Sequence, residues 1–329
     1  MQQANCKFKC FGYNSINRTP RTSPRQRVMC PRGDIFYLEG LALELKPATT
    51  LDEQIDLLRQ RNCLINDEAF CKQVLRQINY YRFSAYFLPF RTQNGSYLEG
   101  TNFRRVYRIY EFDGKMRQVL FSAIEQVELY LRAQLAYFHA HKYGPFGYMD
   151  ASNYGSKHDH QRFLKLFADE VNYNKKVPFV KHHQENYDGK FPIWVATELF
   201  TFGMLSYFYG DMQTSDKKGI AKSLYGTTYY NLDSWLRCCT DLRNICAHYG
   251  RLYYRIFSAI PATPDGFPIR LGRRLFDNIE MLSFLYPDRD KWNNEVLLSI
   301  IALIDEYSED IELRHIGFPT NWEKLLYKA

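Results

Sequence analysis

The stretch IEQVELYLRAQLAYFHAHKYG, Ile124 to Gly144, decides the class of fold. Apolar side chains recur in it and just before it at every third or fourth position, at Leu120, Ile124, Val127, Leu131, Leu135 and Phe138. This is the period of an α-helix, so these side chains form one stripe that can be buried against other helices. The pattern predicts a long helix from Phe103 to about His141.

Helical patterns surround this segment on both sides. Thr50-Leu-Asp-Glu53 is a capping box in front of an amphipathic segment at residues 51–61. Further helical segments are expected at residues 68–81, 158–174, 193–209, 215–224, 230–256 and 291–309. Only residues 92–101, which carry Asn-Gly and Glu-Gly turn signals, predict a short β-hairpin. We therefore predict an all-α helical bundle with helical elaborations and room for one hairpin.

The positive charge of the chain is concentrated at its N-terminus. The net charge is +7, and residues 1–33 hold seven of the 43 lysines and arginines but none of the 36 acids. The remainder is therefore electrically balanced, and an anion site in it must come from local clustering. We predict a basic, flexible N-terminal extension over residues 1–45 and a single domain over residues 46–329. The extension could attract RNA, although a solvated leader or an overlong start explains it more simply.

The composition is that of a globular protein, with 46% hydrophobic residues. The longest apolar stretches, at residues 296–298 and 300–304, are far shorter than the roughly 20 residues of a membrane-spanning helix. The N-terminus has no apolar core of a secretory signal. We expect a cytoplasmic protein that contacts no membrane, with its eight cysteines reduced. Cys6, Cys10 and Cys30 lack the C-x2-C pair of a zinc site, so no metal is expected.

The segment Leu242 to Ile256 combines an apolar pattern with several cations. On a helical wheel of about 100° per residue its side chains separate into two faces. The face predicted to turn toward the core carries Leu242, Ile245, Cys246, Tyr249, Leu252, Tyr253 and Ile256. The opposite face carries Asn244, His248, Arg251 and Arg255, and Arg243 flanks it.

This polar face suits a phosphodiester. A histidine can exchange a proton near neutral pH, and an arginine can hold non-bridging phosphate oxygens. Asn244 lies four residues before His248, within reach of its ring or of a ribose. These groups could cleave RNA by attack of a 2′-hydroxyl, with proton transfer by His248 and charge stabilisation by Arg243 and without a metal. The plain alternative is a solvated helix face, since an arginine and a histidine at this spacing also arise by chance.

The segment RNICAHYGRLYYR, residues 243–255, resembles the signature of the Abi-like (AbiD/AbiF) abortive-infection proteins, which belong to the HEPN superfamily with its R-[N/H/D]-x-x-x-H ribonuclease motif. Four more segments resemble blocks of that family in order and spacing. They are INYYRFSAYFLPFR (78–91), IEQVELYLRAQLAYFHAHKYG (124–144), PIWVATELFTFGMLSYFYGDM (192–212) and IGFPTNWEKLL (316–326). The resemblance covers the chain from about residue 47 to its end.

The resemblance implies an all-α HEPN fold, metal-independent RNA cleavage, and growth arrest of an infected cell as a defence against phage. HEPN sites are usually composite, and this chain has one motif. The resemblance therefore implies a homodimer in which Arg243, Asn244 and His248 of both subunits line one cleft. Some family members are encoded beside a small structured RNA, which makes such an RNA a candidate regulator in a toxin–antitoxin arrangement.

The chain departs from the family pattern at two places. Many relatives carry a second histidine directly after the motif histidine, where this chain has Tyr249. Because Tyr249 falls on the predicted core face, we expect little effect on catalysis. The basic extension to about residue 45 has no counterpart in the pattern.

Glu125, Glu128 and Arg132 border the apolar stripe of the central helix and could orient Arg243 or His248. The alternative is an intrahelical pair of Glu128 with Arg132, worth a few tenths of a kcal/mol. Glu198 lies in an apolar block and is predicted to be a buried partner of an arginine. The aromatic block at residues 80–90 could stack bases but more simply packs a core.

Two further functions remain open. A non-catalytic RNA-binding module of a defence system would depend on Arg243, Arg251 and Arg255 but not on the proton of His248. A HEPN scaffold or substrate of a partner enzyme is the third reading.

Overall fold

The computed structural model describes residues 47–328, and the predicted N-terminal extension lies outside them, as do Cys6, Cys10 and Cys30. The helices are α1 Leu51–Gln60, α2 Glu68–Gln77, α3 Tyr80–Ser84, α4 Phe103–Tyr143, α5 His160–Tyr173, α6 Pro178–Asn186, α7 Ile193–Ala196, α8 Phe202–Asp211, α9 Thr214–Tyr225, α10 Tyr229–Ala247, α11 Leu275–Leu285, α12 Arg289–Lys291, α13 Leu298–Glu306, α14 Leu313–Ile316 and α15 Trp322–Leu326. A π-helical turn, Trp292–Leu297, joins α12 to α13. No strand occurs in this part of the chain, so the all-α prediction is confirmed.

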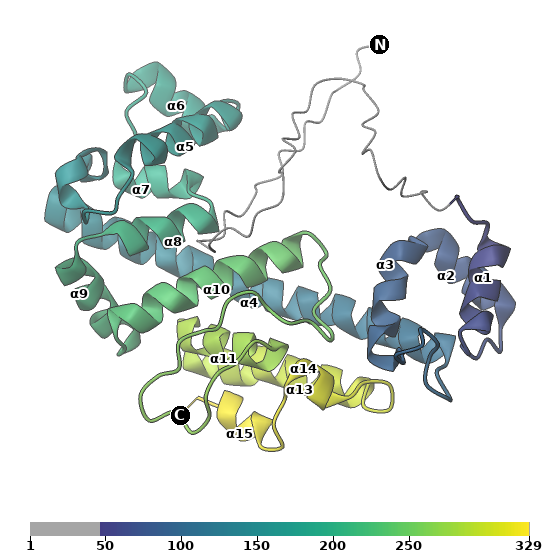
Figure 1. The fold of residues 1–329 in the computed structure, drawn as a ribbon. Helices are drawn as coiled ribbons and strands as arrows, with labels where there is room; N and C mark the ends of the chain where they lie inside the picture. The colour runs from purple at the N-terminus through teal and green to yellow at the C-terminus, as the bar shows by residue number, and fades with distance from the viewer. Residues whose placement is uncertain (1–46, 329) are drawn as a thin grey trace, which may run out of the picture. The chain divides into compact units, whose positions relative to one another are not determined.

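The central helix α4 confirms the prediction made from the apolar stripe. It is 41 residues long, with its N-terminus capped by Asn102 and its C-terminus at Gly144, which adopts a φ of 76°. Leu120, Ile124 and Val127 of the stripe are buried, together with Leu131 and Leu135, whereas Phe138 is partly buried. A helix that presents one continuous buried stripe can organise several shorter helices around it. In Figure 1, α10 lies along α4, and α8, α9 and α11 pack against α10.

The predicted start of α1 is confirmed by its hydrogen bonds. The hydroxyl of Thr50 accepts from the backbone N–H of Glu53 at 3.2 Å, and the Glu53 carboxylate accepts from the N–H of Thr50 at 2.6 Å. These are the two bonds of a capping box, which satisfy N–H groups that the first helical turn leaves open. Hydrogen bonds to Thr50 lower the pKa of Glu53.

The helix predicted at residues 193–209 is interrupted. α7 ends at Ala196, a 3-10 turn follows at Thr197–Leu199, and α8 begins at Phe202 with Thr201 as its cap. Arg132 of α4 donates to the carbonyls of Thr197, Glu198 and Phe200 at 3.1, 2.7 and 2.8 Å. Because the guanidinium satisfies carbonyls that a continuous helix would use itself, it stabilises the break.

The hairpin predicted at residues 92–101 is reduced to a turn. An isolated antiparallel bridge joins Arg91 to Tyr97, and Thr92 N–H donates to Ser96 O at 2.9 Å. The two arms are too short to form a strand pair, and the side chain of Thr92 closes the turn by donating to Ser96 O at 2.8 Å.

The prediction that one helix covers residues 230–256 is wrong beyond Ala247. His248 is the C-cap of α10, and Tyr249 adopts a left-handed φ of 56°. Tyr249 N–H donates to Cys246 O at 3.2 Å and Gly250 N–H to Ile245 O at 2.7 Å. This bond pair is the Schellman motif, which ends a helix by turning the chain out of it. Residues 251–256 therefore lie in a loop.

The early end of α10 changes the two faces predicted from the wheel. Tyr249 and Ile256, predicted to face the core, are 69% and 62% exposed. Leu252 and Tyr253 are buried as predicted, but as loop residues. Arg251 and Arg255 consequently do not share a helical face with Asn244 and His248.

None of the helices between residues 47 and 328 has the length and apolar content needed to cross a membrane.

Candidate active site

The last two turns of α10 place the predicted motif residues at one end of the helix. Arg243 is half-buried, whereas Asn244, one turn before the end, and His248, the C-cap, are exposed. The guanidinium carbon of Arg243 lies 5.9 Å from the centre of the Phe121 ring of α4. The structure thus brings these three predicted catalytic residues together within the final turns of one helix.

The side chains of Arg243, Asn244 and His248 have no hydrogen-bond or ion-pair partner within residues 47–328. The Nε atom of Arg243 is buried and unpaired as well. A buried polar nitrogen without a partner carries a desolvation cost, so bonds within the described chain do not explain the position of this guanidinium. Arg243 is therefore available to an anion such as a phosphate.

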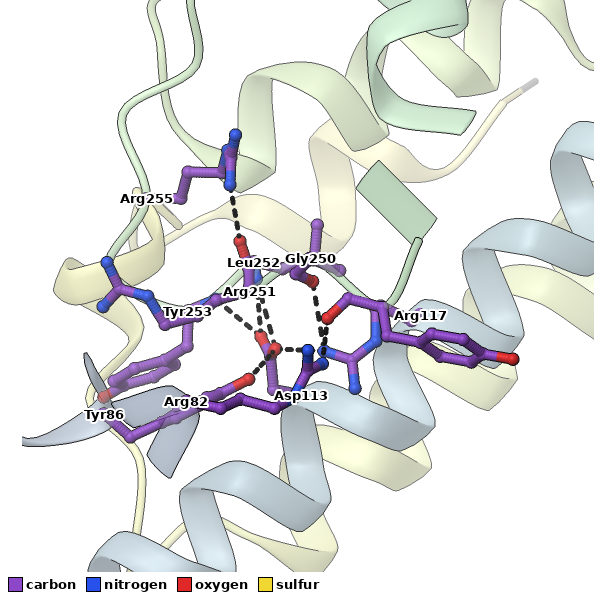
Figure 2. A network of polar contacts seen from close by, with 10 residues as sticks. Arg82, Tyr86, Asp113, Arg117, Gly250, Arg251, Leu252, Tyr253 and Arg255 are labelled. Carbon is purple, nitrogen blue, oxygen red and sulfur yellow. Dashed lines mark hydrogen bonds and ion pairs between the residues drawn. The ribbon is translucent and has the colours of Figure 1, made fainter. Parts of the chain in front are cut away.

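A buried carboxylate holds the chain that leaves this helix. Asp113 of α4 is fully buried and accepts from the backbone N–H groups of Leu252 at 3.0 Å and Tyr253 at 2.6 Å. Figure 2 shows Asp113 at the centre of the network, where it also accepts from the Tyr86 hydroxyl at 2.7 Å and pairs with Arg117. Asp113 fixes the loop directly after the motif.

Arg117, on the same helix as Asp113, also holds this loop, and we call the two residues together the clamp. It pairs with Asp113 at i, i+4 and donates to the carbonyl of Gly250 at 3.2 Å. The negative charge of Asp113 raises the pKa of Arg117, so its guanidinium stays charged despite burial. The clamp thus holds residues on both sides of Arg251.

The predicted RNA-binding residues Arg251 and Arg255 lie in this loop. Arg251 donates to the carbonyl of Ala85 at 2.9 Å, and Arg255 donates to the carbonyl of Arg251 at 3.3 Å. In the reverse direction Arg82 donates to the carbonyl of Tyr249. Burial lowers the pKa of Arg251 from its ordinary value. Arginine–carbonyl hydrogen bonds in both directions therefore join the loop at residues 249–256 to residues 82–85 (Figure 2).

The supporting residues predicted on α4 separate into two groups. Glu128 pairs with Arg132 at 2.6 Å, and Arg132 holds the carbonyls at the break before α8. Neither residue forms a hydrogen bond or ion pair with Arg243 or His248 in the described chain. Glu125 is exposed and lies one helical turn after Phe121, whose ring is near the Arg243 guanidinium. Glu198 does face Arg132, at 3.8 Å, but its side chain is 55% exposed rather than buried.

Sequence reasoning missed Asp113 and Arg117. Their partners Tyr86, Gly250, Leu252 and Tyr253 lie 27 to 140 residues away along the chain. One signal was present, because an acid and an arginine at i, i+4 interrupt the apolar stripe between Ile109 and Leu120. Such a pair on a buried face indicates a structural or functional ion pair.

Among the described residues, no group of three or more His, Cys, Asp or Glu side chains is placed to hold a metal ion. His158 and His160 do lie together, with Nε2 and Nδ1 3.1 Å apart, and His158 also contacts Asp211 at 3.0 Å. Cys63, Cys71, Cys238, Cys239 and Cys246 are free and buried.

A family model described as Abi-like protein matches residues 73–254, more than half of the chain, and this span includes Asp113 and the whole motif. No curated protein and no solved structure matches the sequence.

Proposed function

The chain belongs to the Abi-like protein family, and we propose that it is a metal-independent endoribonuclease of the HEPN type that acts in abortive infection. Family membership suggests the role in abortive infection. The observation that supports the chemistry is the set of side chains at the end of α10: Arg243, Asn244 and His248 lie together and are unpaired within the described part of the chain.

The proposed reaction is cleavage of an RNA phosphodiester by the neighbouring 2′-hydroxyl. An imidazole of His248 takes the hydroxyl proton while the 2′-oxygen forms a bond to phosphorus. The bond from phosphorus to the 5′-oxygen breaks, and that oxygen receives a proton. Arg243 stabilises the charge on the non-bridging oxygens, and Asn244 contacts the ribose or the His248 ring. The products carry a 2′,3′-cyclic phosphate and a 5′-hydroxyl.

This reaction needs one group to take a proton and another to give one, and each chain carries one motif. We therefore propose a homodimer in which the second imidazole is His248 of the partner subunit. Phe121, Glu125 and Leu129 form an exposed strip of α4, with Phe121 and Leu129 40% and 53% exposed. The Phe121 ring lies 5.9 Å from the guanidinium carbon of Arg243, and the strip is a candidate contact between the subunits. A small structured RNA remains the proposed regulator of the activity.

A non-catalytic RNA-binding module is the second candidate. It is favoured by the arginines of the loop after the motif, which bind backbone carbonyls and pair with no carboxylate of the described chain. The two functions differ at His248, whose proton matters only for cleavage.

The test is RNA cleavage by purified protein in excess EDTA, comparing wild type with His248→Ala and Arg243→Ala. Arg237→Ala is the matched control, because Arg237 is on the same helix and pairs with Asp233 at 3.4 Å. The proposal expects cleavage by wild type and by the control but not by the two motif variants. Absence of cleavage by wild type, with RNA still bound by His248→Ala but not by Arg243→Ala, would support the binding module.

A further inference from the structure

Two tyrosines of the loop after α10 have a backbone conformation that tyrosine rarely adopts. Tyr249 and Tyr254 both have a φ of 56°. The other non-glycine residues with positive φ in the described chain are Asn62 and Asp188, types that tolerate this conformation. A β-carbon in the left-handed region is unfavourable, and glycine would relieve it. Two tyrosines with this backbone conformation in one loop are therefore candidates for a functional role.

Both rings are accessible. Tyr249 is 69% exposed, and its side chain has no ring contact or hydrogen bond with other described residues. Tyr254 is 36% exposed, with its ring 5.3 Å from that of His315, near edge-to-face, and 5.7 Å from the guanidinium carbon of Arg274. Neither ring contributes to the buried core, so core packing does not explain either one.

Several arginines bond to the backbone of the loop that carries these tyrosines or extend from it. Arg82, Arg251, Arg255 and Arg274 donate to backbone carbonyls of residues 249, 85, 251 and 255. None of the four forms an ion pair with a carboxylate of the described chain, whereas Arg105 and Arg108 of α4 face acids at 3.6 and 3.1 Å. In Figure 2 the guanidinium groups of Arg251 and Arg255 point away from Asp113. Accessible aromatic rings among arginines without acid partners are the features that bind unpaired nucleotides, through base stacking and phosphate contacts.

We propose that Tyr249 and Tyr254 are stacking platforms for two unpaired bases of the RNA, beside the bond cleaved at His248. This inference rests on the proposed function for its location, and it assigns the two tyrosines as residues that position the substrate. Tyr249 directly follows His248, so its base is adjacent to the reacting phosphate. The two tyrosines are five residues apart, at most about 18 Å along the chain, so both bases belong to one short segment of RNA. Bases in a duplex are already stacked and cannot use either ring.

The test uses variants that remove a ring without straining the fold. Tyr249→Gly and Tyr254→Gly both relieve the left-handed backbone, so a loss of binding cannot be attributed to unfolding. Each is made in a His248→Ala background to prevent cleavage, and binding of a fluorescent single-stranded RNA is measured by anisotropy, with the same RNA in a duplex as comparison. Tyr249→Phe retains the ring, and Tyr173→Ala is the control, because Tyr173 of α5 is 86% exposed.

The inference expects each glycine variant to bind the single strand about 5- to 150-fold more weakly, with Tyr249→Phe and Tyr173→Ala unchanged. The slope of binding against salt should stay the same in the tyrosine variants and decrease in Arg255→Gln. Glycine variants that bind single-stranded RNA like the parent would overturn it, as would equal weakening of duplex binding. A parent that is a dimer and a Tyr249→Gly variant that is a monomer by light scattering would assign that ring to a subunit contact and overturn the inference.

The outcomes separate the inference from the proposed function. If the wild type cleaves RNA and the glycine variants bind it like their parent, base stacking on the two tyrosines is refuted and the ribonuclease function is retained. Tyrosine-dependent binding without cleavage by wild type supports the platforms on an RNA-binding module. Absence of any RNA binding by the parent overturns both.

Discussion

Replacing Asp113 by asparagine should destabilise the protein strongly. The Asp113 side chain is 1% exposed and that of Arg117 is 10% exposed, so the pair belongs to the buried class. Asp113→Asn leaves the Arg117 guanidinium without its carboxylate. An amide oxygen can keep the bonds from Leu252 and Tyr253, but the amide NH2 then replaces the oxygen that accepts from Arg117 and Tyr86. Removal of one member of a buried pair typically costs about 3–5 kcal/mol. We expect a decrease of that size in the free energy of unfolding.

The assay is urea denaturation followed by circular dichroism, with the slope against urea checked for constancy. Asp233→Asn is the control, because Asp233 pairs with Arg237 at the same i, i+4 spacing but with 29% and 61% exposed side chains. That change should cost at most about 0.5 kcal/mol. Adding Arg117→Met to Asp113→Asn should restore most of the lost stability, because both charges are then gone. If Asp113→Asn lowers the free energy of unfolding no more than Asp233→Asn does, the clamp does not stabilise the fold. If the double variant is as unstable as Asp113→Asn alone, the loss is not caused by the unpaired charge of Arg117.

Tyr249→Gly should raise the free energy of unfolding by about 1 kcal/mol, because glycine is favoured at the left-handed position that ends α10; a destabilised variant in urea denaturation would contradict this. Gly250→Ala should cost about 1–3 kcal/mol in the same assay, since the new β-carbon would lie 2.9 Å from Cγ2 and 3.1 Å from the carbonyl oxygen of Ile245, and a neutral effect would show that the turn can shift. Burial raises the pKa of Glu280 from 4.5 to about 7. The shift persists although Lys328 pairs with this carboxyl and opposes it. The folded protein therefore holds a proton that the unfolded chain releases, and stability should fall as pH rises from 4.5 to 7. Glu280→Gln should remove that part of the dependence, and identical pH profiles for wild type and variant would contradict it.

Periodicity was sufficient to predict the fold class and the position of the central helix. The stripe from Leu120 to Leu135 is continuous and buried, and nothing in the segment competes with a helix. The end of α10 was not predictable in the same way. The sequence has tyrosine at the position where helix-ending glycine is usual, and the apolar residues Leu252 and Tyr253 continue the helical period although they lie in a loop.

The candidate site was predictable in part. Arg243, Asn244 and His248 are close in sequence, so any helix ending near Ala247 places them together. The clamp of Asp113 and Arg117 depends on tertiary contacts with residues far away in the chain, and the local pattern shows only an ion pair on an apolar face. The helical wheel also predicted that Tyr249 faces the core, but its side chain is exposed because α10 ends before it.

The most direct test of the central claim is cleavage of a short single-stranded RNA that carries one 2′-deoxyribose at the bond the wild-type protein prefers. The account predicts that this bond resists cleavage while unmodified bonds are cut to 2′,3′-cyclic phosphate ends, because the 2′-hydroxyl is the nucleophile that His248 activates. Cleavage of the deoxy-substituted bond at the normal rate would show that water attacks instead, and would contradict the mechanism assigned to Arg243 and His248.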